Sequence, residues 1–251
     1  MRIQYCSDLH LEFEQNCRCL EEFPLKVSGE VLILAGDIIP LHNEYLTNSI
    51  LQKISENYKQ VFWVPGNHEF YYKDISLFEP SFEINVFNNI SIVNNVLKDY
   101  KGIRFIFSTL WSKIRKSNEK TVENGVADFA CISVGNNNLK SFDFNQLHET
   151  SLRFLEKTLV EKKKKTVVVT HHLPSVRCNA LIHRNSPIND AFCVDLTDFI
   201  ETCDANFWIY GHSHFNQKPI YIGNTILLTN QLGYVQLNEN GTFKPDAYFA
   251  I

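Results

Sequence analysis

The sequence predicts an α/β protein built around a parallel sheet. Two observations support this: short apolar runs alternate with stretches whose apolar residues have helical spacing, and a polar cluster follows most of the runs. Short continuous apolar runs bounded by Gly, Asp or Pro are typical of strands buried on both faces. A strand, a helix and a second strand in succession form a crossover between parallel neighbours.

The predicted strands are rich in β-branched and aromatic residues. The predicted helices repeat apolar residues with a period close to 3.6, as Leu46, Ile50 and Ile54 do. Two stretches rich in Asn and Ser, 73–100 and 112–145, have the least periodicity, and we expect loops or a lid there. Without a composition break or repeat, we expect one domain over 1–251. The strands are expected at 2–6, 31–35, 61–65, 103–109, 166–170, 206–210, 225–230 and 234–238, and the helices at 43–58, 146–161 and 195–201.

Composition favours a cytoplasmic enzyme over a membrane protein or a nucleic-acid binder. The net charge of −4 argues against a surface dedicated to nucleic-acid binding. The basic run Lys162–Lys165 is expected at the end of a helix, where it faces the negative end of the helix dipole. The chain has neither a signal-peptide pattern nor an apolar run of about 18 residues. Its seven cysteines are odd in number and scattered, which is typical of a reduced compartment.

Polar clusters at the ends of five predicted strands carry the chemistry. Loops at the carboxyl ends of parallel strands meet at one edge of a sheet, where ligands bind. Carboxylate oxygen, amide oxygen and imidazole nitrogen are all ligands for divalent cations. We therefore expect a metal site at this edge. The clusters are Asp8-Leu9-His10, Gly36-Asp37, Gly66-Asn67-His68-Glu69, His171-His172 and Gly211-His212-Ser213-His214.

The spacing within the clusters indicates two cations. In extended backbone, Asp8 and His10 would point the same way and serve one ion. Asp37 follows a glycine that permits a sharp turn, and its two oxygens can bridge two ions. His212 and His214 would also share a direction and serve one ion each. Two divalent cations outweigh the charge of two carboxylates, which would attract a phosphate and lower the pKa of a bridging water.

In this order, D-x-H, G-D, G-N-H-E, H and G-H-x-H, the chain resembles the calcineurin-like metallophosphoesterase superfamily over nearly its whole length. The strings SDLHLEF, STLW and TNQLGY resemble the bacterial cytoplasmic branch. The resemblance implies a four-layer α/β/β/α sandwich with a dimetal site at the carboxyl ends of the sheet strands. It also implies hydrolysis of a phosphomonoester or a phosphodiester.

The resemblance assigns site residues by position. His68 would contact phosphate and assist the leaving group, and Asp37 would bridge the two metals, so these two residues are the catalytic candidates. Asn67 and His68 would bind substrate. His172 is the alternative to His171. The mixed ligands admit Mn, Fe or Zn. One metal would be held by Asp8, His10, Asp37 and His214, and the other by Asp37, Asn67, His171 and His212.

Other residues have open roles. Glu69 either orients His68 or a ligand, or caps the following turn. Asn230 is a candidate for contact with substrate or a ligand histidine, and Trp111 is expected to be a packing aromatic although it resembles a family residue near the site. Glu12 and Thr109 share that resemblance. His183 and Arg184 follow the His171 strand in a loop and are expected at the surface, with a position facing the pocket as the alternative, and His42 and His148 are expected outside the site.

The predicted reaction is direct in-line attack on phosphorus by a metal-bridging hydroxide, without a covalent phosphoenzyme. The sequence does not name the substrate or the oligomeric state. Two alternatives stay open: a cyclic-nucleotide phosphodiesterase or nuclease using the same site, and a non-catalytic binding module on the same scaffold. The second is disfavoured because such a module loses ligands, and every motif ligand is present here.

Overall fold

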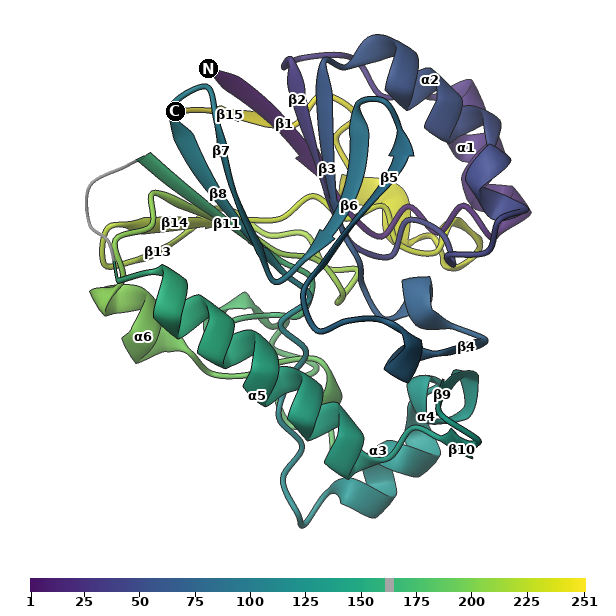
Figure 1. Cartoon of the computed structure of the whole chain (residues 1–251), viewed down its shortest axis with the longest axis vertical. Coiled ribbons are helices and arrows are strands. Elements are labelled where there is room, and N and C mark those ends of the chain that lie inside the picture. The colour runs from purple at the N-terminus through teal and green to yellow at the C-terminus, as the bar shows by residue number, and fades with distance from the viewer. Residues whose placement is uncertain (161–164) are drawn as a thin grey trace.

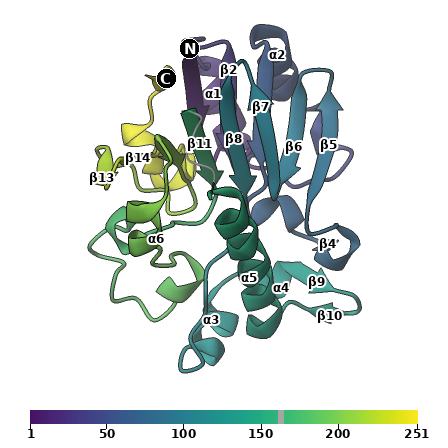
Figure 2. The same cartoon turned by 60° about the vertical axis from the view of Figure 1, so that its left-hand side comes forward.

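The computed structural model describes residues 1–160 and 165–251, and its two six-stranded sheets lie face to face between two layers of helices (Figure 1, Figure 2). The predicted four-layer α/β/β/α sandwich is thereby confirmed. The first sheet contains, in spatial order, β15 (Tyr248–Ala250), β1 (Arg2–Cys6), β2 (Val31–Ala35), β3 (Gln60–Val64), β6 (Ile90–Asn94) and β5 (Phe82–Phe87). The second contains β13 (Ile220–Ile222), β14 (Thr225–Leu228), β12 (Phe207–Ile209), β11 (Lys165–Thr170), β8 (Ile103–Ser108) and β7 (Val96–Tyr100).

The inner strands of each sheet are parallel, and the edge strands are antiparallel. β1, β2, β3 and β6 run together in the first sheet, and β8, β11, β12 and β14 run together in the second. The loops that follow β1, β2 and β3 therefore leave from one edge of the first sheet, as those after β11 and β12 do in the second. This arrangement gathers the predicted polar clusters.

Strand β2 shows why continuous apolar runs form these strands. Val31, Ile33 and Ala35 face the second sheet and pack in the core between the two sheets. Leu32 and Leu34 point the other way, toward α1 (Glu14–Glu22) and α2 (Ser49–Asn57). The second sheet is covered by α5 (Ser141–Thr158) and α6 (Thr197–Thr202) on its outer face. A strand buried on both faces needs apolar residues at every position.

The prediction of loops over 73–100 is wrong, because this stretch supplies β5, β6 and β7. The polar residues that hid the strands pair with each other: the Ser91 hydroxyl donates to the Asn85 side-chain oxygen across β5 and β6 at 2.8 Å. The other residues of β6 are also buried, and Ile90, Ile92 and Val93 are apolar, as a strand covered on both faces requires. Period-two alternation on β5 is the signal that was missed.

The stretch 112–145 is also more ordered than a loop. It contains α3 (Glu119–Gly125), α4 (Asp128–Cys131) and the first turn of α5. A small sheet joins β10 (Asn137–Asn138), β9 (Ile132–Val134) and β4 (Lys73–Asp74). Val122, Phe129 and Phe144 pack with Phe70 and Trp111 in a separate apolar core. We call residues 119–139 the inserted segment.

The strand predicted at 234–238 is wrong, because Val235–Leu237 form a 3-10 helix. Gly233 and Asn238 have φ of +71° and +60°, and this left-handed backbone on both sides breaks an extended run.

The helices predicted at 43–58 and 146–161 correspond to α2 and α5 with shifted ends, and 161–164, including most of the basic run, lies outside the described residues. Of the helices that the structure describes, not one combines the length and the apolar content needed to cross a bilayer.

Replacing Ile33 with Ala should lower the free energy of unfolding by about 2–5 kcal/mol, because it leaves a cavity between the sheets. Ile33 has 0% exposure. Urea unfolding followed by circular dichroism measures the change. Ile182→Ala is the matched control at a position 82% exposed, and it should change stability by about 0.5 kcal/mol or less. Equal losses in both variants would contradict the two-sheet core.

Candidate metal centre

The loops after β1, β2, β3, β11 and β12 bring all seven predicted ligands together. Six of the seven side chains are buried, and His214 is half-buried, so the donors are held within the protein and not at its surface. Their donor atoms form two groups. Group one contains Asp8, His10 and His214, and group two contains Asn67, His171 and His212, with Asp37 beside both.

In group one, the Nε2 atoms of His10 and His214 lie 3.0 Å apart. The His214 Nε2 atom also lies 3.5 Å from the Asp8 carboxylate. These three side chains come from both sheets, since His214 follows β12 and the other two follow β1.

In group two, the His171 Nε2 atom lies 3.1 Å from the His212 Nδ1 atom and 3.2 Å from the Asn67 side-chain oxygen. The Asp37 Oδ2 atom lies 3.3 Å from His171 Nε2 and 3.9 Å from His10 Nε2. The Asp37 carboxylate is therefore placed between the groups. Its pKa is well below the usual value: burial acts to raise it, but the nearby His171 and His68 outweigh this effect.

Each of the four histidines in the groups directs one ring nitrogen inward and the other to an acceptor oxygen. The outer contacts are His10 Nδ1 to Glu12 Oε1 at 3.0 Å, His214 Nδ1 to Glu239 Oε2 at 2.6 Å, His171 Nδ1 to the Ala35 carbonyl at 2.8 Å and His212 Nε2 to the Ala191 carbonyl at 3.3 Å.

These outer contacts decide what the inner nitrogens present. Carboxylate and carbonyl oxygens only accept hydrogen bonds, so each outer nitrogen carries a hydrogen, and in a neutral imidazole the inner nitrogen is then a lone pair. The inner nitrogens of His10 and His214 then face each other as lone pairs. In group two, burial acts to lower the pKa of His171, but the Asp37 carboxylate raises it to about 9, so without a cation the His171 Nε2 atom holds a proton opposite the lone pair of His212. Burial lowers the pKa of His10 and of His212, which favours the neutral form of these two rings. Opposed lone pairs beside carboxylates fit a cation between them.

The backbone geometry differs from the one expected from the spacing. Asp8, His10, His212 and His214 have φ between +47° and +77°, and Asp37 has φ of +54°. The assumption of extended backbone is wrong, because tight left-handed turns, not a strand pleat, aim these side chains. Non-glycine residues in this region cost about 1–3 kcal/mol each and concentrate at functional sites.

Glycines give the ligands room. A Cβ atom on Gly66 would collide with the Asp37 carboxylate and the His171 ring, and one on Gly36 would collide with the same ring. Gly36 also has φ of +92°, the sharp turn expected before Asp37. The glycines of the G-D and G-N-H-E motifs therefore make space for a histidine that arrives from the other sheet.

Glu69 binds backbone and does not contact the His68 ring. Its fully buried carboxylate accepts hydrogen bonds from the N–H groups of Asp37 and Ile38 at 2.9 and 2.7 Å, Gly66 at 2.6 Å and the Trp63 indole at 2.9 Å. Of the two roles considered, orientation of a ligand is supported, through the backbone of Asp37. Burial raises the pKa of Glu69 to about 7, the Asp37 charge adds to this, and the N–H donors oppose it.

His68 lies beside the two groups in a defined orientation. Its ring stacks on Tyr71 with centroids 4.1 Å apart, and its Nδ1 atom lies 2.9 Å from Glu12 Oε1. The Nε2 atom faces the Tyr234 hydroxyl at 3.3 Å. Burial acts to lower the pKa of His68, but the charges of Asp37 and Glu12 raise it to about 9. The ring can therefore hold a proton on Nε2.

His172 is placed differently from His171. Its ring centroid lies 5.2 Å from that of Trp111 and 4.1 Å from that of His212. Within the described chain, neither of its ring nitrogens has a hydrogen-bond partner. It lies behind group two, so the geometry favours His171 as the ligand. Trp111 is 2% exposed and packs in the core of the inserted segment, as expected.

The remaining candidates lie outside the groups. The Asn230 amide donates to the Tyr5 and Lys244 carbonyls, so it supports backbone and does not face the ligands. His148 is buried, with Nδ1 3.2 Å from the Leu110 carbonyl. His42 contacts the Tyr71 carbonyl, and Thr109 donates to the Pro65 carbonyl. Arg184 and His183 are exposed. His183 lines a cavity of about 150 Å³ that borders group two through Phe192, whose ring stacks on His212.

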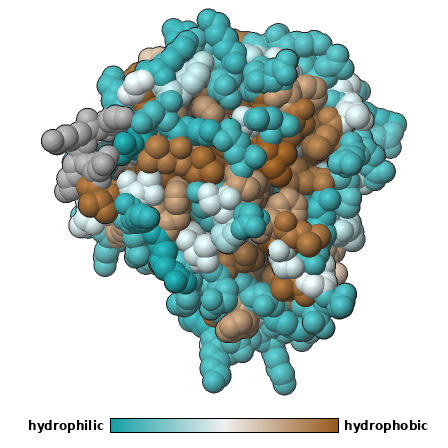
Figure 3. Space-filling model, viewed as in Figure 1, coloured by the Kyte–Doolittle hydropathy of each residue, from teal (hydrophilic) through white to brown (hydrophobic). Residues whose placement is uncertain are grey.

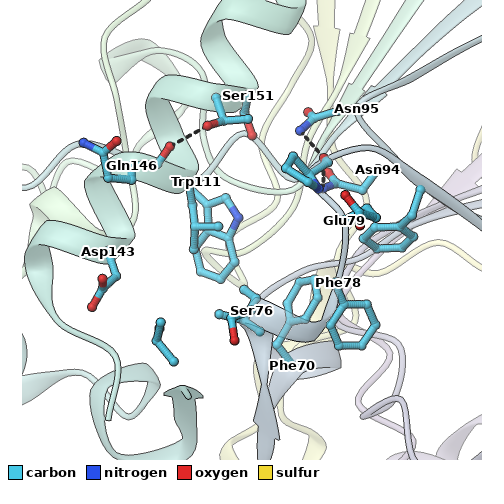
Figure 4. A pocket seen from close by; sticks show the side chains of 16 residues that line it. Phe70, Ser76, Phe78, Glu79, Asn94, Asn95, Trp111, Asp143, Gln146 and Ser151 are labelled. Carbon is cyan, nitrogen blue, oxygen red and sulfur yellow. Dashed lines mark hydrogen bonds between the residues drawn. The ribbon is translucent and has the colours of Figure 1, made fainter. Parts of the chain in front are cut away.

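A larger cavity, of about 370 Å³, is lined in part by Trp111. It opens on the face where Figure 3 shows apolar residues gathered between β5 and α5. Phe70, Phe78 and Trp111 provide its apolar wall, and Asn94 and Gln146 add polar groups (Figure 4). None of the predicted ligands lines it, so it is separate from the candidate metal centre.

Known proteins resemble this chain in sequence and in fold. The calcineurin-like phosphoesterase model matches residues 1–216. An uncharacterized protein of Acanthamoeba polyphaga mimivirus is 34% identical over 278 aligned positions, covering 100% of this chain and 97% of the viral protein. The chain belongs to the calcineurin-like phosphoesterase family. As a family member it is a phosphoric-ester hydrolase.

A solved member of the same fold is the phosphopantetheinyl hydrolase of Mycobacterium tuberculosis. It superposes with a TM-score of 0.68 at 18% sequence identity, over 93% of this chain and 90% of that one. At this identity the likeness concerns the fold alone.

Replacing Glu69 with Gln should destabilise the protein although the two side chains have the same shape. The amide would point an NH₂ group at backbone donors, leaving a buried N–H without an acceptor at a cost of about 1–3 kcal/mol. Urea unfolding at pH 8, where the Glu69 carboxylate is ionised, measures the loss. Glu22→Gln, at an exposed position, is the control. Equal stability of E69Q and wild type would show that the four hydrogen bonds do not depend on a carboxylate.

Proposed function

We propose that the chain is a two-metal phosphohydrolase that cleaves a phosphomonoester or a phosphodiester. The observation that carries the proposal is the pair of opposed inner imidazole nitrogens in each group, with the Asp37 carboxylate between the groups. Without a cation, the lone pairs of His10 and His214 oppose each other, and the His171 ring holds a proton beside Asp37. With one in each group, every donor is satisfied.

The donors divide as expected from the motif order. When bound, two ions would supply Lewis-acid charge for the phosphoryl oxygens and lower the pKa of a water. Mixed oxygen and nitrogen donors suit Mn, Fe or Zn. One ion would be held by Asp8, His10, Asp37 and His214, and the other by Asp37, Asn67, His171 and His212.

The chain's own residues supply positioning and a proton. Glu12 accepts the Nδ1–H of His68, which leaves the Nε2–H of this ring beside the Tyr234 hydroxyl, 3.3 Å away. From Nε2 the proton passes to the departing oxygen of the ester, so a poor leaving group departs as an alcohol and not as an alkoxide. Asn67 and His68 are adjacent in the chain, so a ligand to one ion and the proton donor share one short turn.

The metal proposal is tested with Asn67→Ala and His212→Ala. Each variant should hold one ion fewer than wild type and hydrolyse p-nitrophenyl phosphate at least about 10-fold more slowly, because a donor of group two is gone. Metal content is measured by mass spectrometry after loading with Mn²⁺. His183→Ala, outside both groups, should retain metal and turnover. Unchanged turnover in both ligand variants would rule out the dimetal site.

The role of His68 is tested with a leaving-group series. His68→Ala should reduce turnover by about 10²–10⁴-fold for esters of weakly acidic alcohols, and much less for p-nitrophenol, which departs without a proton. Metal content should not change. The readout is the slope of log kcat against leaving-group pKa, with His42→Ala as control. A reduction by the same factor across the series would exclude proton donation by His68.

The ester class is tested with mono- and bis-p-nitrophenyl phosphate on the wild-type protein. Preference for the bis ester would support a cyclic-nucleotide phosphodiesterase or nuclease, whereas hydrolysis of neither would favour the binding-module alternative.

A further inference from the structure

Asp128 is a fully buried carboxylate that the inserted segment carries to the candidate metal centre. It is the first residue of α4 and has 0% exposure. It lies 61 positions from Asn67 in sequence, yet its Oδ1 atom accepts a hydrogen bond from the Asn67 Nδ2 atom at 2.8 Å. Removing a carboxylate from water is costly unless it has a task or a partner.

This contact selects one orientation of the Asn67 amide. A carboxylate accepts hydrogen bonds and donates none, so it takes the NH₂ end of the amide. The oxygen end must then point the opposite way, where it lies 3.2 Å from His171 Nε2 in group two. The two ends of an amide have nearly the same shape, so packing alone distinguishes them poorly.

We propose that Asp128 is a positioning residue that holds the Asn67 side-chain oxygen toward the metal of group two. The inference rests on the proposed function, in which that oxygen is a ligand. Without Asp128, the amide would present its NH₂ group to the cation in part of the molecules, and the affinity for that ion would fall.

The inserted segment is anchored well enough for this task. Phe129 packs beside Phe70 in the core of the segment, and the Tyr72 N–H donates to the Cys131 carbonyl at 2.6 Å. The Tyr71 hydroxyl also donates to Asp128 Oδ1, at 2.9 Å. One carboxylate oxygen therefore holds the amide of Asn67 and the ring that stacks on His68.

The second oxygen of Asp128 makes a conservative test possible. Its Oδ2 atom is buried, and the structure shows no hydrogen-bond partner for it among the described residues. In Asp128→Asn, the amide oxygen can take the place of Oδ1 and still accept from Asn67. Asp128→Ala removes the acceptor altogether.

Mn²⁺ binding to the metal-free, full-length variants tests the proposal. Titration against a fluorescent chelator gives the affinity of each ion, and circular dichroism with thermal unfolding selects the folded variants. D128A should weaken one of the two ions about 10–100-fold and leave the other unchanged. D128N should recover at least half of that loss on a logarithmic scale.

Asp74→Ala is the matched control for loosening of the inserted segment. Asp74 accepts from the Gly135 N–H at 2.9 Å and so ties the same segment down without contacting Asn67. D74A should keep both affinities within twofold. Three results would overturn the inference: equal binding of two ions by D128A and wild type, a loss in D128N equal to that in D128A, or an equal loss in D74A. Wild type that binds fewer than two ions would instead overturn the dimetal proposal.

Discussion

The candidate metal centre depends on one buried carboxylate that binds no candidate ion. The two carboxylate oxygens of Glu69 accept hydrogen bonds from backbone N–H groups after β2 and β3 and from the Trp63 indole N–H. These contacts fix the left-handed turn at Asp37, and thereby the only carboxylate that lies beside both groups in the described chain. A rigid loop matters here because a donor displaced by about 1 Å no longer serves the same ion. Backbone anchoring supplies that rigidity before any cation is bound.

The fold and the gathering of the ligands could be predicted because each rests on local sequence signals. The run at 31–35 is apolar at every position, which only a strand covered on both faces tolerates. The histidines of the string WIYGHSHFN follow such a strand directly, so the edge that they occupy follows from the parallel topology. His212 and His214 do lie in different groups, but left-handed turns produce that separation and not extended backbone.

The surroundings of the ligands could not be predicted in the same way, because they arise from contacts between distant segments. Asp128 is one acidic residue in an aperiodic stretch, and nothing near it in sequence marks it as a partner of Asn67. Glu239 orients His214 from 25 positions away, again without a local signal. Tyr234 lies in the string TNQLGY, which marked the loop but not the ring that faces His68. Strands β5 and β6 are hidden in the sequence because Asn85 and Ser91 interrupt their apolar runs, and these two side chains pair only across the folded sheet.

Both ligand groups draw on the two sheets at once, since His171, His212 and His214 leave the second sheet and the other donors leave the first. An ion in either group would therefore cross-link the halves of the sandwich at their shared edge. By mass action, such a ligand favours the closed sandwich by RT ln(1 + [M]/Kd), where [M] is the free metal concentration. The supply of metal in the cell would then set the lifetime of the folded chain against proteases as well as its rate of catalysis.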